Sequence, residues 1–314
     1  MKNQLAKTRF SAALGIACHL FGRAASLGAI ILICHSATAQ DLYVSARDDT
    51  GGKVLRFSWD GLQSTFALGL SDPQGLAMDS AGNLFVADVV GDDPVISLIY
   101  KFRPDGMRST FATLAGLPAE LVFDATGNLF VSDYGRGSIY EYKPDGSRTT
   151  FASGLNRPQG LAFDRAGNLF VGETTYNGHI YKYKPNGTRA TFASGFSGQM
   201  HLACDNAGNL FVSGFFGDII SGTVYKITPN GVRTTFASGM YAPGSLAFDY
   251  QGNLFVVDLG ILPEVPSVIY EFTPAAKRSI FARAAGSRQP GLEFNYLAFQ
   301  PLQPIPPPPP TPEN

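Results

Sequence analysis

The chain has 314 residues, 45% of them hydrophobic, with a formal charge of −1 and a mean hydropathy of +0.03. This composition is typical of a globular protein with a large core, and it excludes a disordered chain and an integral membrane protein. The length allows one large domain or two ordinary ones.

The first 39 residues are predicted to be a secretory signal peptide. They contain four basic residues and no acidic one, then the apolar run LGAIILIC at 27–34, and they end in Ala37-Thr38-Ala39. A basic start, a short apolar segment and small residues before the cut are the features of a signal cleaved here after Ala39. The alternative, an uncleaved anchor, needs a longer apolar run. We therefore expect a secreted or periplasmic protein with no membrane span.

Cleavage changes what the composition implies. The mature chain keeps 20 basic and 25 acidic residues, a formal charge of −5, which argues against a nucleic-acid partner. Cys18 and Cys34 leave with the signal, so Cys204 is the one remaining cysteine. This excludes an internal disulfide framework and a cysteine cage for zinc.

A repeat of 40 to 45 residues runs through the rest of the chain. Its clearest form is PQGLAMDSAGNLFVAD at 73–88, which nearly recurs as PQGLAFDRAGNLFVGE at 158–173. The glycine of the GNLF motif falls at Gly82, Gly127, Gly167, Gly208 and Gly252. The phenylalanine of the TFA or IFA motif keeps step with it, at Phe66, Phe111, Phe151, Phe192, Phe236 and Phe281.

Each repeat contains four short runs that favour strands. In the unit at 160–194 they are GLAFD, NLFVGE, HIYKYKP and TRATFAS, rich in β-branched and aromatic residues and separated by Gly, Asp and Asn turns. Four strands joined by hairpins in such a period are typical of one blade of a β-propeller.

The ends of the chain predict six blades. The innermost-strand motif occurs six times, and the last copy, LAFQ at 297–300, has no further strand after it. The missing three strands are supplied at the start of the mature chain, by 41–47, 53–59 and 64–67. We therefore predict an all-β six-bladed propeller over 40–300, whose last blade combines one C-terminal with three N-terminal strands. Residues 301–314 are predicted to be a proline-rich disordered tail.

With these motifs the chain resembles the NHL-repeat propellers and the wider gluconolactonase and senescence-marker-protein superfamily. The resemblance covers essentially all of 41–300 and rests on scaffold motifs, so it is specific for the fold and weak for activity. It implies a six-bladed propeller, in a family that includes calcium-dependent lactonases and many extracytoplasmic proteins without assigned activity.

Two rings of residues are predicted at the mouth of the central channel, just before the inner strands. The first ring reads Gly75, Glu120, Gly160, His201, Ser245 and Tyr296. The second, one residue earlier, reads Gln74, Ala119, Gln159, Met200, Gly244 and Asn295. Glycine is the default of the first ring, and Glu120, His201 and Tyr296 depart from it. We expect any ligand to bind there, through Gln74, Glu120, Gln159, His201, Asn295 and Tyr296.

Two interpretations of the first ring remain open. Glu120 and His201 are candidate catalytic residues, because a carboxylate and an imidazole facing one cavity can work as an acid–base pair. Alternatively, these polar groups only plug the channel. The acids that end the second strands are interpreted as hydrogen-bond acceptors of the repeat; they are Asp88, Asp133, Glu173 and Asp258.

The sequence favours a binding module over an enzyme. The resemblance implies calcium held at the channel mouth, where Glu120 and Asn295 match in type but the family's aspartate has no counterpart. A propeller lyase with paired histidines is a further alternative, but only His201 is placed near the axis. We expect a monomer that binds a small molecule, a glycan or a protein, with calcium-dependent lactonase as the alternative.

Overall fold

The computed structural model describes residues 40–92, 94–214, 222–260, 265–284 and 293–300. All of them lie in the unit formed by Ser36–Asn314. The predicted signal peptide and the predicted proline-rich tail fall outside the described residues. Within the described part of the chain, no helix is long and apolar enough to cross a membrane.

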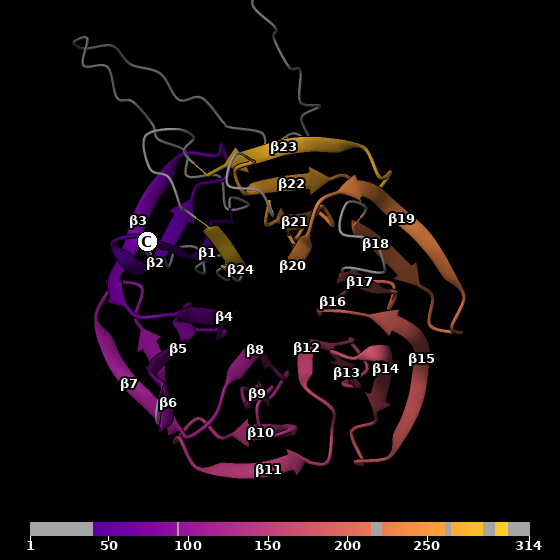
Figure 1. Cartoon of the computed structure of the whole chain (residues 1–314), viewed down its shortest axis with the longest axis horizontal. Helices are drawn as coiled ribbons and strands as arrows, with labels where there is room; N and C mark the ends of the chain where they lie inside the picture. Colours follow the sequence, from indigo (N-terminus) through magenta and orange to yellow (C-terminus); the bar gives the residue numbers. More distant parts are fainter. Residues whose placement is uncertain (1–39, 93, 215–221, 261–264, 285–292, 301–314) are drawn as a thin grey trace, which may run out of the picture. The chain divides into compact units, whose positions relative to one another are not determined.

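The described strands form six four-stranded antiparallel sheets, which are the blades of a β-propeller (Figure 1). Blade 1 consists of β4 (Pro73–Met78), β5 (Leu84–Asp92), β6 (Val95–Phe102) and β7 (Arg108–Leu114). Blade 2 consists of β8 (Pro118–Phe123), β9 (Leu129–Asp133), β10 (Ser138–Tyr142) and β11 (Arg148–Ala152). Blade 3 consists of β12 (Pro158–Phe163), β13 (Leu169–Glu173), β14 (Tyr176–Tyr183) and β15 (Arg189–Ser197).

The other three blades repeat the same order from the centre outward (Figure 1). Blade 4 consists of β16 (Met200–Cys204), β17 (Leu210–Gly214), β18 (Gly222–Ile227) and β19 (Arg233–Met240). Blade 5 consists of β20 (Pro243–Phe248), β21 (Leu254–Asp258), β22 (Val268–Phe272) and β23 (Arg278–Arg283). Blade 6 consists of β24 (Glu293–Phe299), β1 (Leu42–Asp48), β2 (Gly51–Phe57) and β3 (Gln63–Leu70).

Blade 6 confirms the predicted closure by the two ends of the propeller. The C-terminal strand β24 pairs antiparallel with the N-terminal strand β1, with Leu42 opposite Phe299 and Val44 opposite Leu297. The N–H of Gln300 donates to the carbonyl of Asp41 at 3.0 Å and extends this pairing by one step. The inner edge of β1 is thereby paired with a strand from the other end of the chain.

The phenylalanines that mark the repeat pack neighbouring blades together. Phe130 of blade 2 contacts Phe151 of the same blade and Phe163 of blade 3 edge to face, both with ring centroids 5.1 Å apart. Equivalent triads are centred on Phe85, Phe211 and Phe255. Edge-to-face packing of buried rings contributes beyond their burial, so these motif residues serve the scaffold.

One face of the propeller carries the uniform turns, and we call it the turn face. A carboxylate oxygen of Asp79 accepts from the N–H groups of Ala81 and Asn83 at 3.0 and 2.8 Å, and Gly82 adopts φ +79°. Blades 2 to 5 repeat this turn with Asp124, Asp164, Asp205 and Asp249. The aspartate and the glycine are therefore turn chemistry, as the sequence indicated.

The acids predicted at the ends of the second strands are hydrogen-bond acceptors, although β5 continues beyond Asp88 to Asp92. Asp88 accepts from the N–H groups of Ser71 and Asp72, at 3.0 and 2.7 Å. The same position binds backbone N–H groups through Asp133, Glu173 and Asp258. These carboxylates hold the segment that enters each inner strand, which confirms their interpretation as part of the repeat.

The inner strands begin two to four residues earlier than predicted. A register shift with one extra residue lies between Pro73 and Leu76 of β4, and similar bulges occur in four other inner strands. The proline, the glycine and the bulge hide the alternating pattern that marks a strand. The two predicted rings therefore lie inside the inner strands rather than before them.

Candidate functional site

Large and small side chains alternate around the first ring. Blades 2, 4 and 6 contribute Glu120, His201 and Tyr296, each buried, whereas blades 1, 3 and 5 contribute Gly75, Gly160 and Ser245. The six inner strands surround the central channel (Figure 1). The ring thus has a two-blade period superimposed on the one-blade repeat.

The small residues are required by close contact between neighbouring inner strands. A Cβ on Gly75 would lie 2.3 Å from the carbonyl oxygen of Ala119, and one on Gly160 would lie 2.7 Å from that of Met200. Both distances are shorter than any real contact of that kind. Each glycine therefore lets its strand approach the neighbouring strand that carries Glu120 or His201.

A buried serine on the second strand accompanies each large residue. Ser132 Oγ accepts from the N–H of Glu120 at 2.9 Å and donates to the carbonyl of Gln159 at 2.8 Å. Ser45 Oγ accepts from the N–H of Tyr296 at 3.0 Å, and Ser213 Oγ donates to the carbonyl of Gly244. Blades 1, 3 and 5 have Ala87, Gly172 and Val257 at this position. Ser132 and Ser45 thus bind the N–H groups of their inner strands at the bulge, where regular pairing is interrupted. Ser132 and Ser213 bind a carbonyl of the next blade's inner strand.

Four side chains form a continuous hydrogen-bonded row across the channel. Thr174 Oγ1 donates to Gln159 Oε1 at 2.8 Å, Gln159 Nε2 lies 3.3 Å from His201 Nε2, and His201 Nδ1 lies 3.3 Å from Glu120 Oε2. With Glu120 ionised, one proton assignment satisfies all three contacts. The imidazole carries its proton on Nδ1, donates it to Glu120, and accepts at Nε2 from the amide of Gln159.

Burial sets the electrostatics of this row. Burial raises the pKa of Glu120, and the hydrogen bond and charge of His201 only partly oppose this effect. Burial also raises the pKa of Tyr296, and the nearby Glu120 charge adds to that shift. The ring of Tyr296 packs edge-on against His201, with centroids 5.2 Å apart. Tyr296 therefore stays a neutral phenol that holds the imidazole in place.

A cavity of about 270 Å³ lies on one side of this row, and we call it the funnel. It is lined by Arg47, Asp72, Gln74, Gln159, Gln199, His201, Gly244, Leu259, Glu293, Asn295 and Tyr296. A second cavity, of about 310 Å³, is lined by Glu120 and by the later residues of the inner strands, including Cys204. The row from Gln159 to Glu120 thus separates the funnel from the rest of the channel.

The structure brings five of the six predicted ligand-binding residues together. Gln74, Gln159, His201, Asn295 and Tyr296 all line the funnel. Glu120 is the exception, because its side chain lies behind His201 and lines the second cavity. The predicted acid–base candidates Glu120 and His201 are in contact, but only the histidine reaches the funnel.

Sequence reasoning missed the charged groups of the funnel. Arg47 and Asp72 form an ion pair at 3.2 Å, and Glu293 lies nearby. These residues lie in connections or at strand ends whose length differs between blades. The repeat therefore does not align them with equivalent positions in other blades. The three buried serines could have been found from the sequence. Ser45, Ser132 and Ser213 occur in every second blade, in step with the large residues of the first ring.

The predicted calcium ligands do not fit a calcium site in the described residues. Glu120 lines the second cavity and bonds to His201, whereas Asn295 lines the funnel and its amide nitrogen approaches the carbonyl of Pro73 at 3.4 Å. Among the residues that the structure describes, no group of three or more Asp, Glu, His or Cys side chains comes together. Calcium requires six to eight oxygen ligands, usually with more than one carboxylate.

Solved structures share this fold at low sequence identity. A gluconolactonase from Xanthomonas campestris is 17% identical, with a TM-score of 0.59 over 81% of this chain and 95% of that one. A virginiamycin B lyase from Staphylococcus aureus, with quinupristin, is 14% identical, with a TM-score of 0.57 over 84% and 93%. Regucalcin, a calcium-binding protein from Agrobacterium tumefaciens, is 13% identical, with a TM-score of 0.58 over 75% and 80%.

These likenesses confirm the fold that the resemblance implied. The chain is a six-bladed propeller, similar in fold at low identity to the gluconolactonase, regucalcin and virginiamycin B lyase structures. No protein-family profile matches the chain, and no curated protein matches it in sequence. At this identity the likeness extends to the fold and not to the activity.

Proposed function

We propose that this protein is an extracytoplasmic binding module whose ligand enters the funnel. The observation that carries the proposal is the chemistry of the funnel wall. Four amide side chains, Gln74, Gln159, Gln199 and Asn295, converge with His201 and Tyr296 on one cavity. Convergent polar groups in a concave site on a rigid scaffold are typical of ligand recognition.

The funnel suits a small neutral ligand rich in hydroxyl groups. Amides donate and accept at once, as hydroxyl groups do, so Gln74, Gln199 and Asn295 can make paired hydrogen bonds with a sugar. Among the described residues that line the funnel, Arg47 is the one lysine or arginine, and it pairs with Asp72. A cavity of about 270 Å³ has the size for a monosaccharide rather than for a folded protein segment.

The hydrogen-bonded row favours binding over catalysis. A general base needs a free lone pair directed at the reacting group. Nε2 of His201 faces the amide of Gln159, which is itself held by Thr174. The imidazole is therefore engaged on both sides, and it forms a rigid floor for the funnel.

A panel of neutral sugars tests this function on the purified chain. A ligand that binds the native state raises the melting temperature, and the stabilisation grows with the logarithm of the ligand concentration once this exceeds Kd. We expect at least one sugar to do so, and both Gln74→Ala and Asn295→Ala to weaken its binding about tenfold, the cost of one good hydrogen-bonding group. Gln63→Ala, an exposed amide on β3, is the matched control and should leave binding unchanged. A panel without any response, or binding indifferent to Gln74→Ala, would refute the proposal.

Lactone chemistry is the second candidate function. It is favoured by the contact between His201 and the buried Glu120, because a carboxylate behind an imidazole is the arrangement of a general base. A substrate would have to displace Gln159 to reach Nε2. Turnover of a lactone panel that is lost in both Glu120→Gln and His201→Gln would establish this candidate. Assays with and without calcium, read also as melting temperature, would show whether a metal takes part.

Export is part of the proposal and has its own test. The basic start, the apolar run and Ala37-Thr38-Ala39 support cleavage after Ala39. N-terminal sequencing of protein recovered outside the cytoplasm should begin at Gln40. A cytoplasmic protein that retains Met1 would contradict this part of the proposal.

A further inference from the structure

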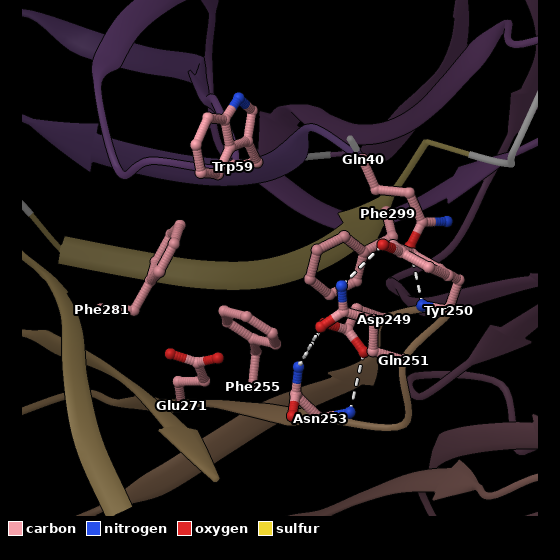
Figure 2. A pocket seen from close by; sticks show the side chains of 10 residues that line it. All are labelled: Gln40, Trp59, Asp249, Tyr250, Gln251, Asn253, Phe255, Glu271, Phe281 and Phe299. Carbon is pink, nitrogen blue, oxygen red and sulfur yellow. Dashed lines mark hydrogen bonds between the residues drawn. The ribbon is translucent and has the colours of Figure 1, made fainter. Parts of the chain in front are cut away.

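The turn face carries another cavity, at the junction of blades 5 and 6, and we call it the seam groove. It has a volume of about 310 Å³ and is lined by Gln40, Trp59, Asp249, Tyr250, Gln251, Asn253, Phe255, Glu271, Phe281 and Phe299 (Figure 2). Figure 2 shows Trp59 across the groove from Phe255 and Glu271. The groove is separate from the funnel, with which it shares no lining residue.

Other blades show what occupies the corresponding position. In blade 4 the ammonium group of Lys226 lies 5.5 Å from the ring centroid of Phe211 and 3.9 Å from Asp205 Oδ2. In blade 3, Lys182 lies 5.2 Å from the Phe170 ring and 3.7 Å from Asp164. The repeat thus builds an ammonium site from an aromatic face and the aspartate of the turn. Blade 1 has the same arrangement, with Lys101 between Phe85 and Asp79.

Blade 5 keeps the aromatic face and the aspartate but reverses the charge of the third residue. Phe255 and Asp249 correspond to Phe211 and Asp205, and Glu271 stands where blade 4 has Lys226. Asp249 binds the backbone and side chain of Asn253, as in every such turn. Glu271 accepts only a long hydrogen bond from Ser279, at 3.4 Å, among its contacts with described side chains. The groove therefore presents two carboxylates beside an aromatic face.

Blade 2 provides an internal comparison for this charge reversal. It also has a glutamate at this position, Glu141, but Lys143 pairs with that carboxylate at 2.6 Å. Blade 5 has Thr273 in place of Lys143. Blades 1, 3 and 4 thus have a lysine at the position of Lys226, and blade 2 has one at the position of Lys143. Blade 5 has Glu271 and Thr273 at these two positions, and neither is a cation.

The wall of the seam groove also differs from that of the other grooves, in a way that favours a cation. A proline from the next blade walls two comparable grooves, Pro185 between blades 2 and 3 and Pro274 between blades 4 and 5. In the seam groove that position is Trp59, whose side chain is 70% exposed. Tryptophan is the aromatic residue that best attracts a cation. An exposed indole opposite two carboxylates is the chemistry of an organic-cation site.

We propose that the seam groove binds an organic cation, an ammonium or guanidinium group, between Trp59 and Phe255 and beside Glu271 and Asp249. The bound group takes the place that the lysines of blades 1, 3 and 4 occupy in their own grooves. A guanidinium plane can stack on the indole while its N–H groups donate to Glu271. The cation comes either from a small free amine or guanidine, or from a basic side chain of another protein.

Trp59 is the single tryptophan of the chain, so its fluorescence reports on this groove. We expect butylguanidinium to change the emission of the full chain in a saturable way, and butylurea, which has the same shape without the charge, to have no effect. The peptide acetyl-Gly-Arg-Gly-amide forms the second arm. Tighter binding of the peptide assigns a protein side chain as the source, and tighter binding of the small ion assigns a free guanidine.

Substitutions of Glu271 show whether the fluorescence change comes from binding in the seam groove or from an unspecific effect of the cation. Glu271→Lys restores the residue type of blade 4 and should abolish the response while the melting temperature stays equal or rises. Glu271→Gln should weaken binding about tenfold. The matched control is Glu141→Lys, which makes the same charge change in blade 2 and should leave the response intact. The proposal fails if neither cation gives a saturable change, if butylurea acts equally, or if Glu271→Lys retains the response.

Discussion

Alternate blades of this propeller play different parts at the channel. Blades 2, 4 and 6 contribute the large residues Glu120, His201 and Tyr296, whereas blades 1, 3 and 5 contribute residues small enough for the strands to approach each other. The backbone repeats once per blade, but the side chains of the channel repeat every second blade. Neighbouring inner strands approach so closely at Gly75 and Gly160 that a larger side chain would clash with the strand carrying Glu120 or His201.

The strongest test of this alternation is to enlarge a small position. Gly75→Ala places a Cβ 2.3 Å from the carbonyl oxygen of Ala119, so two inner strands must separate. We expect the free energy of unfolding to fall by about 3 kcal/mol, measured by urea denaturation. Gly244→Ala is the matched control, because its Cβ would approach only Leu259, at 3.6 Å. A loss as small as that of the control would show that close strand contact does not dictate the small residues.

The serine that accompanies each large residue provides the second test. Ser132→Ala removes the acceptor for the N–H of Glu120 and the donor to the carbonyl of Gln159, both buried. We expect a loss of about 2 kcal/mol, since buried polar groups lose their partner. The exposed Ser64→Ala should change stability by less than about 0.5 kcal/mol. Equal effects of the two substitutions would contradict a supporting role for the serines.

The third and smallest effect is the pH dependence that Glu120 contributes. Burial raises the pKa of Glu120 above its ordinary value of 4.5, so folding favours the protonated carboxyl. The stability gained is complete below that ordinary value and is lost as the pH rises through the raised pKa. Glu120→Gln, which keeps an acceptor for His201, should therefore become more stable relative to the wild type as the pH rises through the raised pKa. A stability difference that does not vary with pH would contradict the raised pKa.

The sequence sufficed for the fold because the repeat marks it many times over. Phe130, Gly127 and Asp124 each recur at the same place in several blades, and β24 pairs with β1 as the missing inner strand required. The funnel was less predictable. Gln74 and Asn295 stood in register with the repeat and were found, whereas Arg47, Asp72 and Glu293 came from segments of variable length. The direction in which Glu120 points depends on its contact with His201, 81 residues away, which no local pattern encodes.

The central claim is that the floor of the funnel is a hydrogen-bonded row with a fixed imidazole, and NMR of the imidazole nitrogens tests it most directly. Spectra of ¹⁵N-labelled protein, assigned to His201 by comparison with His201→Gln, report which nitrogen carries the proton. Above the titration of Glu120, the row predicts a proton on Nδ1, bonded to Glu120, and an Nε2 that accepts from Gln159. A proton on Nε2, or an imidazole that exchanges freely between both forms, would contradict the account.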